Sequence, residues 1–359
     1  MTKIALICDT HYGVRSDSPV FHDYFRRSMK SFIDHIETNN IQHVIHLGDL
    51  FDRRKYLSYL TSSVCRETFL IPLNEMGIST HIIAGNHDQY YTNTYLVNSL
   101  DEIIGSRYEN IKIYNTPVTI QIDDLDILLL PWINLANKEE TNNEIMNTKA
   151  EVVMGHLELS GFQMYNGVKS EHGQESKIYD KFDLVFSGHY HHKSSYGNIH
   201  YLGAFAEYTW ADYNDPRGFT IFDTETRNFD FIQNPISIFK IVSYDDVTTP
   251  DIIQKINATD YSEYKDTYVK VLSVKRENSY AFDLFIDKLY KAGPIDISVV
   301  EDVTSFIDNQ EDEVVDEAQD TTTILSNYIK GLTLPVNNDK MITIMRSIYN
   351  DALATESFE

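Results

Sequence analysis

Cysteine, long apolar runs and basic charge are all scarce in this chain of 359 residues. Two cysteines, Cys8 and Cys65, do not suit a disulfide framework, so we expect reduced thiols and a reducing compartment. No uncharged apolar stretch reaches the roughly 20 residues that a membrane-spanning helix needs, and no basic, apolar leader precedes the first predicted strand. These absences predict a soluble, cytoplasmic protein without membrane association.

Acidic residues outnumber basic ones, with 54 Asp and Glu against 30 Lys and Arg, for a formal net charge of -24. This excess argues against adhesion to nucleic acid or anionic lipid over the whole surface, but it permits a focal contact. Part of the excess is local, because nine of the twenty positions 301–320 are Asp or Glu. The basic run Arg53-Arg54-Lys55 fits a phosphate contact or a solvated surface equally well.

Short runs rich in Val, Ile and Leu recur along residues 1–235 and end in Gly, Pro, Asp or His, a pattern typical of buried strands. The predicted strands are 4–8, 44–47, 81–84, 127–130, 152–154 and 184–186, and the predicted helices are 20–39, 58–76 and 136–148. Three later runs, 199–202, 219–222 and 229–232, have the close spacing of antiparallel strands, which we assign to a second sheet. We therefore predict an α/β fold, a layered β-sandwich domain flanked by helices.

The strand and helix pattern restarts after residue 235 and predicts a small α/β domain over 236–300, with strands 238–242, 268–274 and 295–300 and helices 250–256 and 280–291. The acidic segment 301–320 holds few clustered apolar residues and is predicted to be a flexible linker. Two amphipathic helices follow within 321–353, and together they cannot bury both of their apolar stripes. They dock either on this chain or on a partner, and the linker favours a partner.

Five short polar blocks stand at the ends of predicted strands. They are Asp9-Thr10-His11, Gly48-Asp49, Gly85-Asn86-His87-Asp88, Gly155-His156 and Gly188-His189-Tyr190-His191. Because ligands collect beyond the carboxyl ends of strands in α/β sheets, we expect these side chains to converge. Each block alone occurs by chance in many chains, but the whole set predicts a site for two divalent metals. Two such metals that share a carboxylate suit in-line displacement at phosphorus.

The predicted ligands divide into two sets that share Asp49. One metal is assigned to Asp9, His11, Asp49 and His191, and the other to Asp49, Asn86, His156 and His189. Imidazoles combined with oxygen donors favour Mn, Fe or Zn over Mg or Ca. The neutral oxygen of Asn86 limits the negative charge, so that a phosphodiester is not repelled. The expected nucleophile is a water between the metals, acidified toward neutrality.

His87 and Asp88 are the candidate catalytic residues. His87 is not expected to bind metal, because its neighbour Asn86 already faces the metal. We predict that His87 hydrogen-bonds the phosphate or protonates the leaving oxygen, and that Asp88 orients it.

In this order and spacing the five blocks resemble the calcineurin-like metallophosphoesterase superfamily, and residues 1–235 resemble the nuclease domain of SbcD-type DNA repair exonucleases. The segments 155–162, 214–219 and 222–226 are similar to the recombination endonuclease subunit of large tailed bacteriophages. The resemblance implies Mn-dependent exonuclease and endonuclease cleavage of DNA ends in recombination and repair. It also implies the host-cell cytoplasm if a phage encodes the chain.

The resemblance further implies partners and DNA contacts. The terminal helices would bind an SbcC-type coiled-coil ATPase, the small domain would cap the DNA, and a homodimer would pack through helices near 58–76 and 93–104. The candidate DNA-binding residues are Arg53, Arg54, Lys55 and Tyr208. Tyr208, like Phe205 and Trp210, fits either stacking on an unpaired base or packing beneath a loop. Relatives often carry a histidine at the position of Asp52, which leaves the role of this acid open.

Two other functions compete with a nuclease. A phosphatase or small phosphodiesterase of the same fold would use the same metals. Ser/Thr phosphatases usually show Gly-Asp-x-Val-Asp-Arg-Gly and Gly-Asn-His-Glu, whereas this chain has Asp52-Arg53-Arg54 and ends its third block with Asp88. The other alternative is a non-catalytic scaffold that clamps DNA and regulates the ATPase, and the complete ligand set argues against it.

Overall fold

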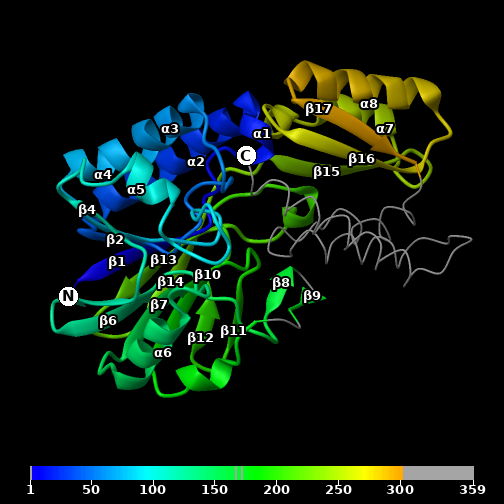
Figure 1. The fold of residues 1–359 in the computed structure, drawn as a ribbon. Coiled ribbons are helices and arrows are strands. Elements are labelled where there is room, and N and C mark those ends of the chain that lie inside the picture. Colours follow the sequence, from blue (N-terminus) through cyan, green and yellow to red (C-terminus); the bar gives the residue numbers. More distant parts are fainter. Residues whose placement is uncertain (1, 166–167, 171–172, 302–359) are drawn as a thin grey trace, which may run out of the picture. The chain divides into compact units, whose positions relative to one another are not determined.

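The computed structural model describes residues 2–165, 168–170 and 173–301. Within them, two six-stranded sheets pack face to face and a three-stranded sheet forms a further module (Figure 1). The predicted linker beyond Glu301 and the predicted terminal helices lie outside the described residues. No helix in the described ranges is both long and apolar enough to cross a bilayer.

The first sheet has the order β14-β13-β1-β2-β3-β4. Its strands are β1 (Lys3–Ile7), β2 (His43–His46), β3 (Ser79–Ile83), β4 (Ile111–Tyr114), β13 (Gly218–Asp223) and β14 (Phe229–Gln233). Strands β1 to β4 are parallel, so the chain must cross over between them, and helices make these connections. The helices are α1 (Val14–Asp17), α2 (Pro19–Thr38), α3 (Tyr59–Cys65), which continues through a π-helical turn into α4 (Ile71–Glu75), and α5 (Ser99–Ile103).

The second sheet has the order β11-β12-β10-β7-β6-β5. Its strands are β5 (Val118–Ile122), β6 (Leu125–Leu130), β7 (Val152–His156), β10 (Leu184–Gly188), β11 (Ser194–Tyr196) and β12 (Ile199–Tyr201). Helix α6 (Lys138–Asn147) links the parallel strands β6 and β7, and a short hairpin of β8 (Gln163–Tyr165) and β9 (Val168–Lys169) lies between β7 and β10.

The three late strands do not form a sheet of their own, contrary to our prediction. Strand β12 pairs with β10, whereas β13 pairs with β1 and β14 in the first sheet. All six residues of β13 are buried. A strand that is covered on both faces belongs inside a sheet, and the place beside β1 gives β13 a neighbour on each side.

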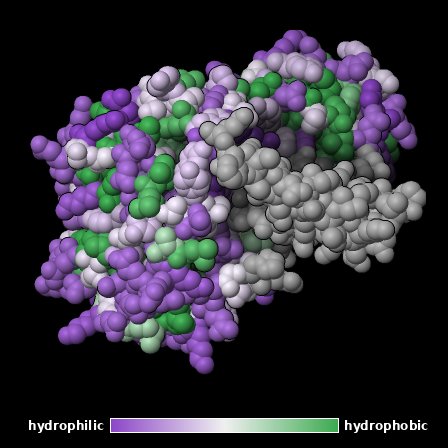
Figure 2. Space-filling model, in the orientation of Figure 1, coloured by the Kyte–Doolittle hydropathy of each residue, from purple (hydrophilic) through white to green (hydrophobic). Residues whose placement is uncertain are grey.

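Three apolar clusters hold these layers together. Residues from both sheets, such as Leu6 and Phe186, fill the space between the sheets. The other face of β1, including Ile7, packs under α2 and its residue Phe32, while Val153 of β7 belongs to the cluster on the outer face of the second sheet. Strands β1 and β7 are therefore buried on both faces, as expected for central parallel strands. In the view of Figure 2, hydrophilic residues cover much of the surface over the sheets, with apolar residues between them.

Residues 239–300 form the β15–β17 module, a parallel sheet in the order β15-β16-β17. It consists of β15 (Phe239–Asp245), α7 (Ile252–Ala258), β16 (Tyr268–Lys275), α8 (Ser279–Ala292) and β17 (Asp296–Val300). The module meets the first sheet's helices where Phe239 and Tyr268 contact Phe21 of α2. The buried carboxylate of Glu207 accepts hydrogen bonds from the backbone nitrogens of Ile238 (2.8 Å) and Phe239 (3.1 Å), which fixes the start of β15.

Candidate metal centre

The predicted ligands lie where strands of both sheets end. Asp9 follows β1, Asp49 follows β2, Asn86 follows β3, His156 ends β7, and His189 follows β10. Backbone hydrogen bonds join the first two loops, from Asp9 N to Gly48 O (3.0 Å) and from His11 N to Asp49 O (3.1 Å). The structure thus brings all five polar blocks to one place.

Four of these residues have a backbone conformation that side chains rarely adopt. The φ angles of Asp9, His11, Asp49 and His189 are +49°, +45°, +55° and +89°. Non-glycine residues in such regions cost on the order of 1–3 kcal/mol each and persist where the surrounding structure requires them. Four such residues among the predicted ligands support the assignment of this place as the functional site.

Glycines allow the loops to approach closely. A Cβ on Gly85 would lie 2.1 Å from Oδ1 of Asp49, and one on Gly188 would lie 2.6 Å from the carbonyl oxygen of Leu47. Neither distance is compatible with a side chain, so glycine is required at both positions by space.

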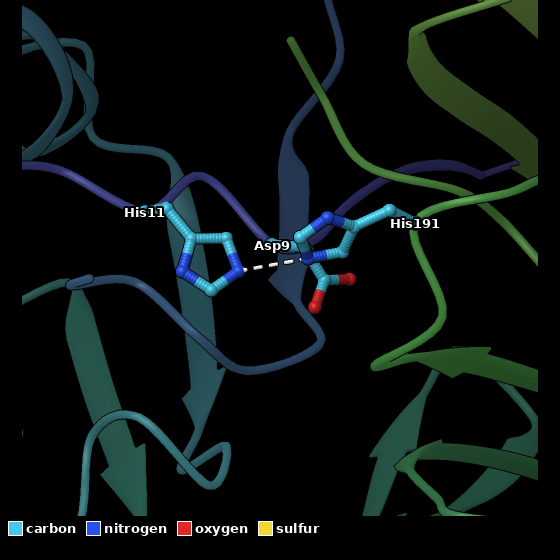
Figure 3. Close-up of side chains that lie close together, drawn as sticks. All are labelled: Asp9, His11 and His191. Atoms are coloured by element: carbon cyan, nitrogen blue, oxygen red, sulfur yellow. Dashed lines mark hydrogen bonds between the residues drawn. The ribbon is translucent and has the colours of Figure 1, made fainter. Parts of the chain in front are cut away.

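Asp9, His11 and His191 form the first ligand cluster (Figure 3). The two imidazoles face each other, with 3.0 Å between their Nε2 atoms, and the Asp9 carboxylate lies beside the His191 ring. Burial lowers the pKa of His11 well below its usual range and the pKa of His191 to about 3. Both rings are therefore neutral near pH 7 and offer lone pairs to a cation.

Asp49, His156, His189 and Asn86 form the second cluster. The Asn86 Oδ1 position lies 2.9 Å from His156 Nε2 and 3.0 Å from His189 Nδ1. The Oδ2 atom of Asp49 is 3.4 Å from the same nitrogen of His156. Four side chains, three from loops and one from the end of β7, thus converge within the buried interior.

Asp49 stands between the two clusters. Its Oδ2 atom lies 3.8 Å from His11 Nε2 as well as 3.4 Å from His156 Nε2, and its Oδ1 atom accepts from the backbone nitrogen of His87 (2.8 Å). Burial opposes the charged forms of Asp49 and His156. Their mutual attraction outweighs it, so the pKa of Asp49 falls well below its usual range and the pKa of His156 rises to about 9.

The donor set fits two divalent cations. Four imidazoles, two carboxylates and one amide oxygen converge, which is a mixture that transition-metal ions prefer. Within the part of the chain that the structure describes, the buried atoms Nδ1 of His11 and Nε2 of His189 have no hydrogen-bond partner. Buried polar atoms are rarely left unpaired, so the centre is built for more than the protein's own hydrogen bonds.

His87 lies at the partly exposed edge of the centre. Its ring stands edge-on to His11, with 4.8 Å between centroids, and its Nδ1 atom is 2.5 Å from the carbonyl oxygen of Asp52. The carboxylate of Asp52 also faces the centre, 3.7 Å from Nδ1 of His11. Asp52 therefore contributes to the site through both its backbone and its side chain.

Asp88 joins two of the ligand loops. Its buried carboxylate accepts hydrogen bonds from the backbone nitrogens of Gly85 (2.9 Å), Phe51 (3.2 Å) and Leu50 (3.3 Å). These bonds tie the loop of Asp49 to the loop that carries Asn86 and His87. Burial raises the pKa of Asp88 to about 6, and the charge of Asp49 adds to this. The orienting role that the sequence suggests for Asp88 stays a prediction.

Tyr208 is not available for stacking on a base, which corrects one of our predictions. The side chain is buried, and its hydroxyl donates to the backbone oxygen of Asp9. Its ring packs against Phe25 and stands edge-on to His11 and His191. The alternative, packing beneath a loop, applies because the tyrosine supports the backbone of a predicted ligand.

The three basic residues of the 53–55 run differ in their surroundings. Arg53 donates to the Tyr56 hydroxyl (2.5 Å) and lies 3.9 Å from a carboxylate oxygen of Asp17. Arg54 is partly buried and lies over the ring of Trp132, whereas Lys55 is exposed. Arg54 reaches the second ligand cluster, with its Nη2 atom 3.2 Å from the amide of Asn86.

Sequence reasoning missed the support that Arg217 gives to His191. The buried guanidinium donates to the carbonyl oxygen of His191 and pairs with Asp212 (2.5 Å) and Asp215 (3.0 Å). Asp212 in turn accepts from the backbone nitrogen of Tyr208 (2.6 Å). Arg217 lies in the segment 214–219, which the sequence marks only through its family resemblance. No spacing rule predicts that its side chain contacts the carbonyl of a residue 26 positions away.

The family model for calcineurin-like phosphoesterases matches residues 2–193. The chain belongs to this family. It is 31% identical over 353 residues to exonuclease subunit 1 of Enterobacteria phage T4, covering 98% of this chain and 99% of that protein. It is 23% identical to the SbcD subunit of the nuclease SbcCD of Staphylococcus epidermidis, covering 92% and 93% of the two chains.

Among solved structures, the chain is similar to the calcineurin-like phosphoesterase YfkN of Bacillus subtilis, with 13% identity and a TM-score of 0.33 over 65% of this chain and 88% of that one. It is also similar to GAP50 of Plasmodium, with 12% identity and a TM-score of 0.41 over 66% and 90%. The family resemblance and the α/β fold predicted from the sequence are confirmed, and this metallophosphoesterase is a metal-dependent enzyme.

Proposed function

We propose that this metallophosphoesterase is the nuclease subunit of a DNA-end-processing complex and cleaves DNA phosphodiester bonds, as an exonuclease and endonuclease, in recombination and repair. The observation that carries the proposal is the place of Asp49, whose Oδ2 atom lies within 3.8 Å of a ligand nitrogen in each cluster. The two relatives named as nuclease subunits, matched over nearly their full lengths, support DNA as the substrate.

The two ligand clusters would hold two divalent cations, which we propose to be Mn²⁺. One would be bound by Asp9, His11, Asp49 and His191, and the other by Asp49, Asn86, His156 and His189. When bound, such a pair polarises the phosphoryl group and lowers the pKa of coordinated water.

His87 is the proposed acid and phosphate ligand. A Nδ1–H that donates to the carbonyl of Asp52 fixes the ring and leaves Nε2 as the other proton-carrying position. From there the ring can hydrogen-bond a phosphate oxygen or, when protonated, deliver the proton to the leaving oxygen. Asp52 positions His87 through its backbone, so this role does not depend on the residue's side chain.

We also propose partners for the complex. The 236–300 region would cap the DNA, the 321–353 region would bind an SbcC-type coiled-coil ATPase, and two copies of the chain would form a homodimer in the cytoplasm. The names of both relatives as subunits support an assembly with other chains.

The substrate is tested by incubating the purified protein and Mn²⁺ with linear double-stranded DNA, a chromogenic phosphodiester and a phosphopeptide in parallel. Asp49→Ala and His189→Ala are the controls for the metal centre. We expect nucleotide release from DNA by the wild type only. Turnover of the phosphopeptide without DNA cleavage would make this a phosphatase, and DNA binding without any hydrolysis would make it a scaffold.

A further inference from the structure

Arg54 lies beside the second ligand cluster and is partly exposed. It follows β2, and its guanidinium lies over the Trp132 ring, 5.3 Å from the centroid. The predicted ligands Asp9, Asp49 and His156 are almost fully buried, whereas Arg54 is partly exposed. A substrate that reaches the centre from solvent therefore meets Arg54 at its edge.

The Asn86 amide has two possible orientations, and they differ in what they offer to Arg54. In the first, its nitrogen faces His156 Nε2 and His189 Nδ1, and its oxygen accepts from Arg54 Nη2 at 3.2 Å. In the second, its oxygen faces the two imidazoles, as a metal ligand must. The NH₂ group then turns toward Arg54. A cation in the cluster selects the second orientation, because only the oxygen can bind it.

The second orientation leaves two donors side by side. The Asn86 nitrogen and Arg54 Nη2 are then 3.2 Å apart with no acceptor between them. The Nη1 atom of Arg54 is also without a hydrogen-bond partner in residues 2–165, 168–170 and 173–301. Among the described residues, no carboxylate lies within 4.0 Å of this guanidinium, unlike that of Arg53. Asp49 and Asp88 attract this guanidinium only from beyond hydrogen-bonding distance, so the pair of donors is open to an anionic acceptor.

We propose that Arg54 and the Asn86 amide together bind a non-bridging oxygen of the scissile phosphate. The planar guanidinium suits phosphate, and charge-assisted hydrogen bonds to it are strong. That the bound phosphate belongs to DNA rests on the proposed function. The phosphate contact itself follows from the two donors beside the metal ligands. Asn86 thereby serves two ligands, the cation with its oxygen and the phosphate with its nitrogen.

The test compares Arg54→Gln and Arg54→Lys with the control Arg107→Gln. Arg107 is exposed, and its guanidinium donates to the backbone oxygens of Ile103 and Glu102. Titration calorimetry measures Mn²⁺ binding and then the binding of inorganic phosphate to the Mn²⁺-loaded protein. Steady-state kinetics on the chromogenic phosphodiester and on DNA separate kcat from KM.

We expect Arg54→Gln to bind Mn²⁺ with unchanged stoichiometry, to bind phosphate at least about tenfold more weakly, and to lose about 10²–10³ in kcat, as for other donors to a developing oxyanion. Arg54→Lys keeps the positive charge but lacks the paired donors of the planar guanidinium. Its phosphate affinity and kcat should therefore lie between those of Arg54→Gln and the wild type. Arg107→Gln should match the wild type in all readouts.

Wild-type phosphate affinity and kcat in Arg54→Gln would overturn the assignment, as would a loss of activity that parallels a loss of Mn²⁺. If the wild type cleaves the diester but not DNA, the DNA proposal fails and the diester data still decide the role of Arg54. If the wild type hydrolyses neither, the proposed function fails, and weaker phosphate binding by Arg54→Gln alone supports the contact.

Discussion

Replacing Gly85 by alanine should disable the metal centre and leave the fold intact. The φ angle of Gly85 is not in the positive range, so alanine can adopt its backbone conformation. The added methyl would however lie 2.1 Å from Oδ1 of Asp49 and 2.3 Å from its backbone nitrogen, where ordinary contacts begin at 3.4 Å. A change of side-chain rotamer cannot relieve a clash with a backbone atom, so the two loops must separate by about 1 Å.

The two consequences of this displacement differ in size. Overpacking of this kind costs about 1–3 kcal/mol, which is less than the usual stability of a domain. A shift of about 1 Å in a catalytic constellation lowers turnover by about 10²-fold. Gly85→Ala should therefore unfold in urea as one cooperative transition of reduced midpoint, while its kcat on the chromogenic phosphodiester falls by two orders of magnitude and its Mn²⁺ binding weakens.

Gly77→Ala is the matched control. Gly77 has a φ angle of +70°, and no atom of the described residues lies within 4 Å of its added Cβ. Alanine there therefore has only the cost of the left-handed conformation, about 1–2 kcal/mol. It should lose stability and keep full activity. The reasoning that the added methyl displaces Asp49 would be refuted if Gly85→Ala kept Mn²⁺ affinity and kcat within twofold of the wild type.

Three further predictions concern stability. Burial lowers the pKa of His46 from 6.5 to about 3. Below pH 6.5 the unfolded chain therefore binds a proton that the folded chain excludes, so the unfolding free energy decreases as pH falls from 6.5 toward 3. His46→Gln should reduce the loss of unfolding free energy between pH 7 and pH 5 by about 2 kcal/mol in urea titrations, and an unchanged loss would contradict this. Arg217→Gln leaves Asp212 and Asp215 without their buried cation and should cost about 3–5 kcal/mol in unfolding free energy, so a cost below about 1 kcal/mol would show that the pairing is dispensable. Mn²⁺ at 100 times its Kd should stabilise the wild type by about 2.7 kcal/mol over the chelator-treated protein, whereas Asp49→Ala should show a much smaller increase in Tm.

The convergence of the polar blocks could be predicted from the sequence because it depends on local signals. Each block follows an apolar run that ends a strand, and parallel strands of one sheet bring such ends together, as for Asp9, Asp49 and Asn86 after β1, β2 and β3. The closeness of Asp49 to His156 depends in addition on how the second sheet packs on the first, which this rule does not give. The partners of β13 could not be predicted in this way. Its spacing from β14 indicates a hairpin, but the pairing with β1 joins residues more than 200 positions apart, as in Lys3 with Asp223.

The role of Tyr208 was ambiguous in the sequence for a different reason. An aromatic ring gives the same composition signal whether it stacks on a base or packs in a core. The burial of Tyr208 and its hydrogen bond to the Asp9 backbone distinguish the two. The support from Arg217 was hidden in a similar way, because its contact is to the main chain of His191 and not to a side chain. Contacts to backbone atoms leave no mark on the identity of the residue that is contacted.

Glu207 and Tyr208 are adjacent in the chain but fasten two different parts of the protein. The carboxylate of Glu207 fixes Ile238 and Phe239, where β15 begins, and the hydroxyl of Tyr208 fixes the main chain of Asp9. One peptide unit therefore separates the residue that holds the β15–β17 module from the residue that holds the Asp9 loop of the metal centre. A force that pulls this module away from α2 would reach the Asp9 loop through a linkage too short to absorb it.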